Sequence, residues 1–380
     1  MSTDERVGLL AYLSKTKGIG GTLKREPRDF IVEEITPGGV ILEVGKNQCF
    51  KDTQGDYTHF TLEKTNWDTM RAVKAIARAC GVSHKRLKFA GTKDRRSVSA
   101  QRVSIWKVPK ERLEGVHIRD IILRDFSVSD GPVNLGMLKG NRFTVIIHDV
   151  AKNADKLVKK TIRQLDGKMP NFFGTQRFGL RLNNHLVGRH ILGGEFKEAV
   201  MSFLCDTGNE PEEATTVRER LRETGDFKKA FEEFPNYLGF EKSVLNHLAK
   251  TPTDYIGALR VLPKKLRLMF IHAYQGYIFN LALSEYLRSG EMPKELPLVG
   301  YTTPLDNVTE EILKREEIHK GQFRVPSMPE MAMEGEMRSS LAKFSDFMIL
   351  GFNKEDSNIK VRFVLPPGTY ATILLRELMK

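Results

Sequence analysis

The chain has 380 residues, more than one typical hydrophobic core supports, so two domains are expected. Lys and Arg total 60 against 48 Asp and Glu, and the net charge of +12 favours a polyanionic partner, nucleic acid first, although solvated lysines also give basic proteins without such a partner. Three widely separated cysteines (Cys49, Cys80 and Cys205), no signal-peptide pattern and no apolar run near about 18 residues argue against a secreted or membrane-spanning protein and favour the reduced cytoplasm.

The first part of the chain is rich in predicted strands. Four runs contain β-branched and aromatic residues, and alternation of apolar and polar residues in two of them indicates half-buried strands. The runs span 40–45, 56–64, 100–108 and 142–150. Between them, the sequence predicts a helix over 66–81, with Asn66 as its N-cap and Gly81 as its C-terminal stop. Its predicted core face comprises Met70, Val73, Ala77 and Cys80.

Helical spacing dominates between residues 185 and 290, where the segments end at Gly, Pro or polar residues. Strand-like sequence returns at 346–353 and again from residue 359. This order predicts an α+β protein in which a strand-rich domain is interrupted by a mostly helical insertion. The predicted parts are 1–183 for the first domain, 184–340 for the insertion and 341–380 for the C-terminal return to the first domain.

The stretch "FAGTKDRRSVSAQ" at 89–101 places one carboxylate, Asp94, among many cations. Gly91 permits a tight turn, and the strand pattern that follows would hold the loop at one end, as is common for catalytic loops. Asp94 could act as an anionic nucleophile or base while the cations bind phosphates. The alternative is an ordinary solvated ion pair in a charged loop. The neighbouring cations are Lys88, Lys93, Arg95, Arg96 and Arg102.

A second stretch, "PNFFGTQRFG" at 170–179, combines aromatic rings with amide and guanidinium groups. An extruded nucleobase needs both, because its face stacks on a ring while its edge accepts or donates hydrogen bonds. A packed core loop explains the same residues equally well. The candidate side chains are Asn171, Phe173, Gln176 and Arg177.

Two further stretches carry candidate residues, and each has a structural alternative. "LKREPRDFIVEE" offers Lys24 and Arg25 before a strand, where a solvated loop is the ordinary explanation. "LPPGTYATILLREL" offers Tyr370 after a Gly-containing turn, where a buried structural tyrosine is equally plausible. No phosphate loop, complete dinucleotide fingerprint, H-E-x-x-H motif or zinc-like Cys/His spacing occurs in the sequence, so neither a cofactor nor a metal is expected.

In this order, "FAGTKDRRSVSAQ", "NFFGTQRFG" and "LPPGTYATILLREL" strongly resemble the signature segments of the TruD family of tRNA pseudouridine synthases. The resemblance extends over nearly the whole chain and is weakest in the helical part. It implies a pseudouridine synthase α+β catalytic domain, with a mixed or antiparallel sheet, interrupted by a TRUD-type insertion. It also implies tRNA as the partner, uridine 13 of the D arm as the target, and no cofactor; no protein partner is evident, and a monomer is expected.

The resemblance also assigns roles to individual residues. Asp94 becomes the catalytic aspartate and Lys24 its ionic partner, while Asn171 matches an active-site position. Phe173 matches the ring that stacks on the target uracil. Tyr370 falls where some relatives carry Phe, and would form a second aromatic wall. Substrate-binding roles follow for Lys93, Arg95, Arg96, Gln176 and Arg177.

Two other classes of function compete with this one. An RNA-binding protein without catalytic activity could use the same basic residues, but it gains nothing from a carboxylate at the centre of a cationic patch. An RNA hydrolase or another base-modifying enzyme would need paired carboxylates, a metal cluster or a cofactor loop, none of which is evident in the sequence. Whether Asp94 adds to the sugar or removes a ribose proton stays open.

Overall fold

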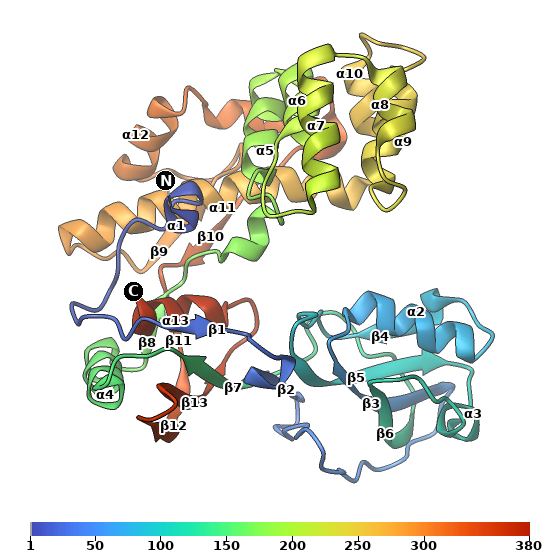
Figure 1. Ribbon diagram of the computed structural model, residues 1–380, viewed down its shortest axis with the longest axis vertical. Coiled ribbons are helices and arrows are strands. Elements are labelled where there is room, and N and C mark those ends of the chain that lie inside the picture. The colour runs from blue at the N-terminus through green and yellow to red at the C-terminus, as the bar shows by residue number, and fades with distance from the viewer. Residues whose placement is uncertain (1) are drawn as a thin grey trace. The chain divides into compact units, whose positions relative to one another are not determined.

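The computed structural model describes residues 2–380, and the chain divides into two compact units (Figure 1). Unit 1 comprises the residues up to Leu13 together with Pro170–Leu341, and unit 2 comprises Ser14–Met169 and Ala342–Lys380. The chain leaves unit 2 in β8 (Lys168–Pro170) and returns to it in β11 (Leu341–Lys343).

Unit 2 is built on a nine-stranded mixed sheet with the order β12-β13-β7-β2-β5-β3-β6; β1 pairs with β7 and β4 pairs with β5. Every neighbouring pair is antiparallel except β2 and β5. The prediction of an α+β protein is therefore confirmed. The strands are β1 (Thr22–Leu23), β2 (Phe30–Ile35), β3 (Tyr57–Thr65), β4 (Leu87–Phe89), β5 (Val98–Trp106), β6 (Ile121–Ser129), β7 (Gly140–His148), β12 (Ser345–Asn353) and β13 (Asn358–Leu365), and the helices are α2 (Thr69–Ala79), α3 (Lys110–Glu114), α4 (Ala154–Leu165) and α13 (Ala371–Met379).

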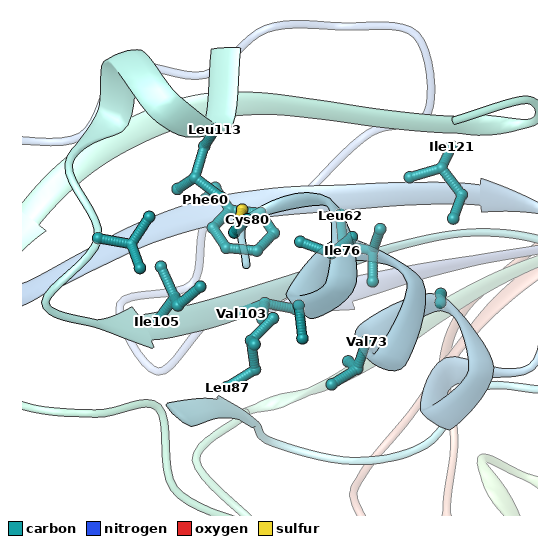
Figure 2. Packing of buried hydrophobic residues seen from close by; sticks show 13 residues of the cluster. Phe60, Leu62, Val73, Ile76, Cys80, Leu87, Val103, Ile105, Leu113 and Ile121 are labelled. Carbon is teal, nitrogen blue, oxygen red and sulfur yellow. The ribbon is translucent and has the colours of Figure 1, made fainter. Parts of the chain in front are cut away.

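Alternation along β3 and β5 gives this part of the sheet one apolar face, which α2 covers. Figure 2 shows Phe60 and Leu62 of β3 and Val103 of β5 directed toward Val73 and Ile76 of the helix. All five side chains are almost completely buried. The intervening strand residues point to the opposite face of the sheet, because side chains alternate along a strand.

The parallel pair β2–β5 determines where the candidate catalytic residues lie. Ile31 is opposite Val98, so both strands begin at the same edge of the sheet. Lys24 comes shortly before β2 and Asp94 shortly before β5. Because parallel strands run in the same direction, the segments that precede them meet at that edge. Two residues 70 positions apart in the sequence are thereby brought into contact.

Unit 1 is mostly helical and is organised around α11, a helix of 26 residues (Lys264–Ser289). The helix α5 (Asn184–Gly193) packs closely against it at Gly188, where an added Cβ would lie 2.2 Å from the carbonyl oxygen of Phe270. The remaining elements are α1 (Thr3–Arg6), α6 (Phe196–Cys205), α7 (Glu212–Thr224), α8 (Phe227–Glu233), α9 (Gly239–Leu248), α10 (Tyr255–Arg260) and α12 (Asn307–Arg315), with a two-stranded sheet of β9 (Glu295–Leu298) and β10 (Glu336–Ser339).

Three details of the structure differ from the sequence-based expectations. The helix over 66–81 begins only at Thr69, because the Asp68 carboxylate accepts a hydrogen bond from Arg71 N and caps it, whereas Asn66 has a left-handed backbone (φ 56°). Met70, expected in the core, is 38% exposed, because the buried face of α2 begins at Thr69 instead. The first unit boundary falls at 169/170, where the sequence favoured 183/184.

The predicted strand at 40–45 is wrong except for one isolated bridge between Ile35 and Ile41. Leu42 N still donates to the Glu34 carbonyl of β2, but the amides that follow bond to side chains of the sheet: Val44 N donates to Glu33 Oε1 and Gly45 N to Glu63 Oε2. These side chains satisfy the donors that a strand ladder would otherwise satisfy. The segment therefore crosses the sheet as a loop.

Candidate active site

An ion pair joins Lys24 and Asp94 at the edge of the sheet where β2 and β5 begin. Lys24 Nζ lies 2.6 Å from Asp94 Oδ2, and their side chains are 20% and 35% exposed, so the pair is partly shielded but open to a ligand. The ammonium also lies 4.1 Å from the centre of the Phe30 ring, a cation–π distance. Lys24 has φ 58°, a left-handed conformation uncommon outside glycine and often found at functional sites.

The backbone of the loop around Asp94 is held by polar side chains, two of which bond to the Asp94 carbonyl. Lys64 Nζ donates to the carbonyls of Trp67 (2.7 Å), Asp94 (3.1 Å) and Lys93 (3.4 Å). Ser97 Oγ donates to the Asp94 carbonyl at 2.7 Å. The Asp94 backbone is thus fixed by hydrogen bonds, which leaves its carboxylate to point toward Lys24.

Lys64 is fully buried, and the dehydration that accompanies burial lowers the pKa of its ammonium from 10.5 to about 8. The negative charges of Asp68 and Asp94 oppose this shift, and the positive charge of Lys93 adds to it. Its three carbonyl partners match the three donors of an ammonium group. The sequence offers a signal for this residue, because Lys64 continues the apolar face of Thr58, Phe60 and Leu62.

The cations of the loop do not all face solvent. Lys93 is buried and pairs with the buried carboxylate of Glu34, with 2.7 Å between Nζ and Oε2, so in this conformation its ammonium is not presented to a phosphate as the sequence suggested. Arg95 and Arg96 are exposed, and Arg96 donates to the carbonyl of Arg25 at 2.8 Å. Lys88 is also exposed, whereas Arg102 is buried.

Tyr370 lies in unit 2, at the N-cap position of α13. β13 ends at Leu365 because Pro366 and Pro367 cannot extend the ladder, and Gly368 turns the chain with φ 77°. The Tyr370 side chain is half-buried, and its carbonyl accepts from Ile373 N at 3.0 Å. The proline–glycine turn therefore fixes the backbone position from which the Tyr370 side chain extends.

The "NFFG" residues belong to unit 1, where they form a buried cluster. Phe173 is only 5% exposed, and its backbone exchanges two hydrogen bonds with the side chain of Asn280 on α11, at 2.9 and 3.0 Å. Its ring centre lies 5.6 Å from that of Phe279, in edge contact, and 4.3 Å from the Arg338 guanidinium. Arg338 in turn donates to Asn171 Oδ1 at 2.6 Å. The cluster holds the Phe173 ring firmly.

The other two candidates of this stretch lie near the cluster. The Arg177 guanidinium is 5.2 Å from the centre of the Phe173 ring, and its Nε donates to the carbonyl of His272 at 3.4 Å. Gln176 is exposed. Arg338, which covers Phe173, carried no sequence signal, because an isolated arginine 165 positions downstream has no local pattern. Glu34 did carry one, since it occupies an inward position of β2 after Phe30 and Val32.

Two general findings bear on the chemistry of the chain. Among residues 2–380, no cluster of three or more His, Cys, Asp and Glu side chains is arranged to hold a metal ion. In the same part of the chain, no helix is long and apolar enough to cross a membrane.

An α+β fold that is interrupted by a helical unit, with an aspartate paired to a lysine on a loop before β5, fits the class of pseudouridine synthases. The family described as tRNA pseudouridine synthase D (TruD) matches residues 6–296 and 286–378 of the chain. The chain belongs to this TruD family.

Individual relatives agree with this assignment. The chain is 33% identical to a Methanosarcina acetivorans protein named "Probable tRNA pseudouridine synthase D", over 99% of this chain and 96% of the relative. It is 37% identical to a Methanococcus vannielii protein of the same name, over 96% and 97%. A crystal structure described as "Putative tRNA pseudouridine synthase D (TruD) from Methanosarcina mazei" superposes with a TM-score of 0.80 at 31% identity, over 99% of this chain and 97% of that one.

Proposed function

We propose that the protein converts uridine 13 in the D arm of tRNA to pseudouridine, with Asp94 as its catalytic carboxylate. One observation carries the assignment of the residue: Asp94 is a partly exposed carboxylate, paired with Lys24 at 2.6 Å, on a loop whose backbone Lys64 and Ser97 hold in place. A catalytic group must be both accessible and preorganised.

The reaction is an isomerisation and needs no net reactant besides the RNA. The bond between N1 of uracil and C1′ of ribose breaks, the base turns, and a bond between C5 and C1′ forms. C5 loses a proton and N1 gains one, so atoms and charges balance. Asp94 can either add to C1′ or remove a ribose proton; both routes need a carboxylate next to the sugar of a flipped nucleotide.

The remaining candidates divide by role. Lys24 orients the carboxylate, and Arg95 and Arg96, which are exposed, bind the phosphates of the RNA. Phe173 and Tyr370 supply aromatic surface for the extruded base. Asn171, Gln176 and Arg177 contribute to substrate binding, and Lys93 supports the loop through Glu34.

Position-resolved mapping of pseudouridine tests this function. An unmodified tRNA transcript incubated with the protein should acquire pseudouridine at position 13. With Asp94→Asn the transcript should acquire none, while the affinity of the variant for the RNA stays within a few-fold of wild type. Asp120→Asn is the matched control, because Asp120 is exposed and pairs only loosely with Arg119, at 3.6 Å. Normal turnover by Asp94→Asn would remove Asp94 from catalysis, and RNA binding without any product would favour an RNA-binding protein without activity.

A further inference from the structure

A cavity of about 240 Å³ lies in unit 2, on the face of the sheet opposite α2. Strands β3, β5 and β6 form its floor, and the segments before β3 and after β6 form its walls. Pockets for drug-sized ligands have volumes of roughly 300–1,000 Å³, so this cavity suits a smaller group, such as a single heterocycle. Its lining comprises Glu34, Thr36, Pro37, Phe50, Lys51, Thr53, His59, Arg102, Ser127, Val128, Ser129, Val133 and Met137.

The cavity has an aromatic side chain, Phe50, in its wall. The Arg102 guanidinium lies 3.9 Å from the centre of the Phe50 ring. Arg102 is itself fixed, because its guanidinium donates to the carbonyl of Asp125 (2.6 Å) and to Ser127 Oγ (2.5 Å). Phe50 is only partly buried, and Met137, 44% exposed, adds apolar surface to the cavity. The face of a flat heterocycle would find contacts here.

The polar groups of the cavity have a defined pattern of donors and acceptors. Ser127 is 5% exposed; its oxygen accepts from Arg102, which leaves its hydroxyl hydrogen to donate. Thr36 likewise accepts from Val40 N at 3.1 Å, with its hydrogen left to donate. These two hydroxyl groups suit a ligand that carries carbonyl oxygens.

His59 supplies the complementary acceptor. Its Nε2 lies 2.7 Å from the carbonyl of Gly131, so this nitrogen carries the hydrogen. Burial lowers the pKa of the imidazole, which keeps the ring neutral at pH 7 and leaves Nδ1 as an acceptor. Hydroxyl donors beside an imidazole acceptor match the adjacent carbonyl and N–H groups of a keto base, uracil or guanine, whereas adenine has no carbonyl.

The cavity is also connected to the loop of Asp94. Glu34 Oε1 accepts from the backbone N of Arg102 at 3.0 Å, and Oε2 pairs with Lys93, the residue before Asp94. Lys51, which is exposed, lies at the cavity and offers a cation for a phosphate. The cavity and the candidate catalytic loop are therefore connected through one buried carboxylate.

We propose that this cavity binds a second unpaired keto base of the RNA substrate, a uracil or guanine other than the one that is isomerised. The proposal rests on the proposed function only in taking RNA as the substrate. The base stacks on Phe50 and bonds through its edge to Ser127, Thr36 and His59.

Abasic substitutions combined with a change of Phe50 test the proposal. tRNA transcripts are made in which each unpaired uridine or guanosine of the D arm is replaced, one at a time, by an abasic nucleotide. With the wild-type protein, one replacement away from the isomerised position should weaken binding about ten-fold, as expected for one stacked base. Phe50→Ala should bind the intact transcript about ten-fold more weakly and should not respond to that replacement. Ile122→Ala, on β6 but outside the cavity and 55% exposed, is the control and should behave as wild type.

Thermal melting first establishes that Phe50→Ala is folded; if it is not, Met137→Trp, which reduces the space of the cavity from an exposed position, replaces it. The proposal is overturned if every abasic transcript loses the same affinity in the variant as in wild type. The binding cycle requires no turnover, so absence of pseudouridine at position 13 would contradict the proposed function and leave this result unaffected.

Discussion

Lys24 contacts Asp94 directly, so its effect should be on turnover more than on RNA affinity. Lys24→Met keeps much of the side-chain length and removes the charge that orients the carboxylate at 2.6 Å. The single-turnover rate on tRNA should fall at least ten-fold while the dissociation constant changes only a few-fold, because a phosphate contact would act mainly on binding. Lys46→Met, at a lysine whose side chain is 66% exposed and pairs with Glu43, serves as the control. An unchanged rate with weaker binding would make Lys24 a phosphate contact.

The buried ammonium of Lys64 should make stability depend on pH in a defined direction. Its pKa is about 8 in the folded chain against an ordinary value of 10.5, so between these values the unfolded chain holds more protons than the folded one. The free energy of unfolding contributed by this group therefore rises with pH across that window, by on the order of 3 kcal/mol in total.

Comparison with Lys64→Met isolates this contribution, because other groups titrate alike in both proteins. The unfolding free energy of wild type minus that of the variant, from urea titrations between pH 7.5 and 10.5, should increase with pH. A constant difference would show that Lys64 keeps an ordinary pKa.

At the scale of elements, the contact between α5 and α11 depends on the absence of a side chain at Gly188. A Cβ there would lie 2.2 Å from the backbone oxygen of Phe270, which cannot move without shifting α11. Gly188→Ala should therefore lower the free energy of unfolding by several kcal/mol, although alanine favours a helix. Gly239→Ala, at the start of α9, is the matched control, since nothing lies within 4 Å of its added Cβ. Equal stability of the two variants in thermal melting would contradict this account.

Substitution of Phe173, which lies in a buried cluster, can distinguish a packing role from base stacking. Phe173→Leu keeps most of the volume that contacts Phe279 and Arg338 but loses the aromatic face. The catalytic efficiency of the folded protein should fall roughly ten-fold to a hundred-fold, since stacking is worth about 1–3 kcal/mol per base. Phe279→Leu, a change of the adjacent ring, should lower the melting temperature comparably and leave turnover near normal. If both variants kept normal turnover, Phe173 would be a core residue only.

The whole molecule shows where sequence patterns were sufficient and where they were not. Alternation placed β3 and β7 within two residues of their observed positions, and β-branched and aromatic composition did the same for β5, which is buried on both faces. The β-branched residues at 40–45 predicted a strand, but the amides of Val44 and Gly45 bond to Glu33 and Glu63, side chains that no local pattern assigns to this segment. The family resemblance paired Lys24 with Asp94, but the exposure of each loop cation depends on distant partners: Lys93 is buried because Glu34 neutralises it.

The net charge of +12 predicts that tRNA binding depends steeply on salt, since each phosphate neutralised by the protein releases counterions. Arg95 and Arg96 are exposed beside Asp94 and should each account for about one such contact. In Arg95→Gln/Arg96→Gln, the slope of log affinity against log salt should become shallower by about 1 to 2, with weaker binding and an unchanged rate at saturating RNA. Arg119→Gln is the control, because the Arg119 side chain is 94% exposed and lies outside this loop in the sequence. It should leave the slope unaltered. Titrations of tRNA with each protein between 50 and 200 mM salt measure the affinity and its slope. An identical slope for the double variant and wild type would mean that these arginines do not touch the phosphate backbone, and that the basic surface used by the RNA lies elsewhere on the chain.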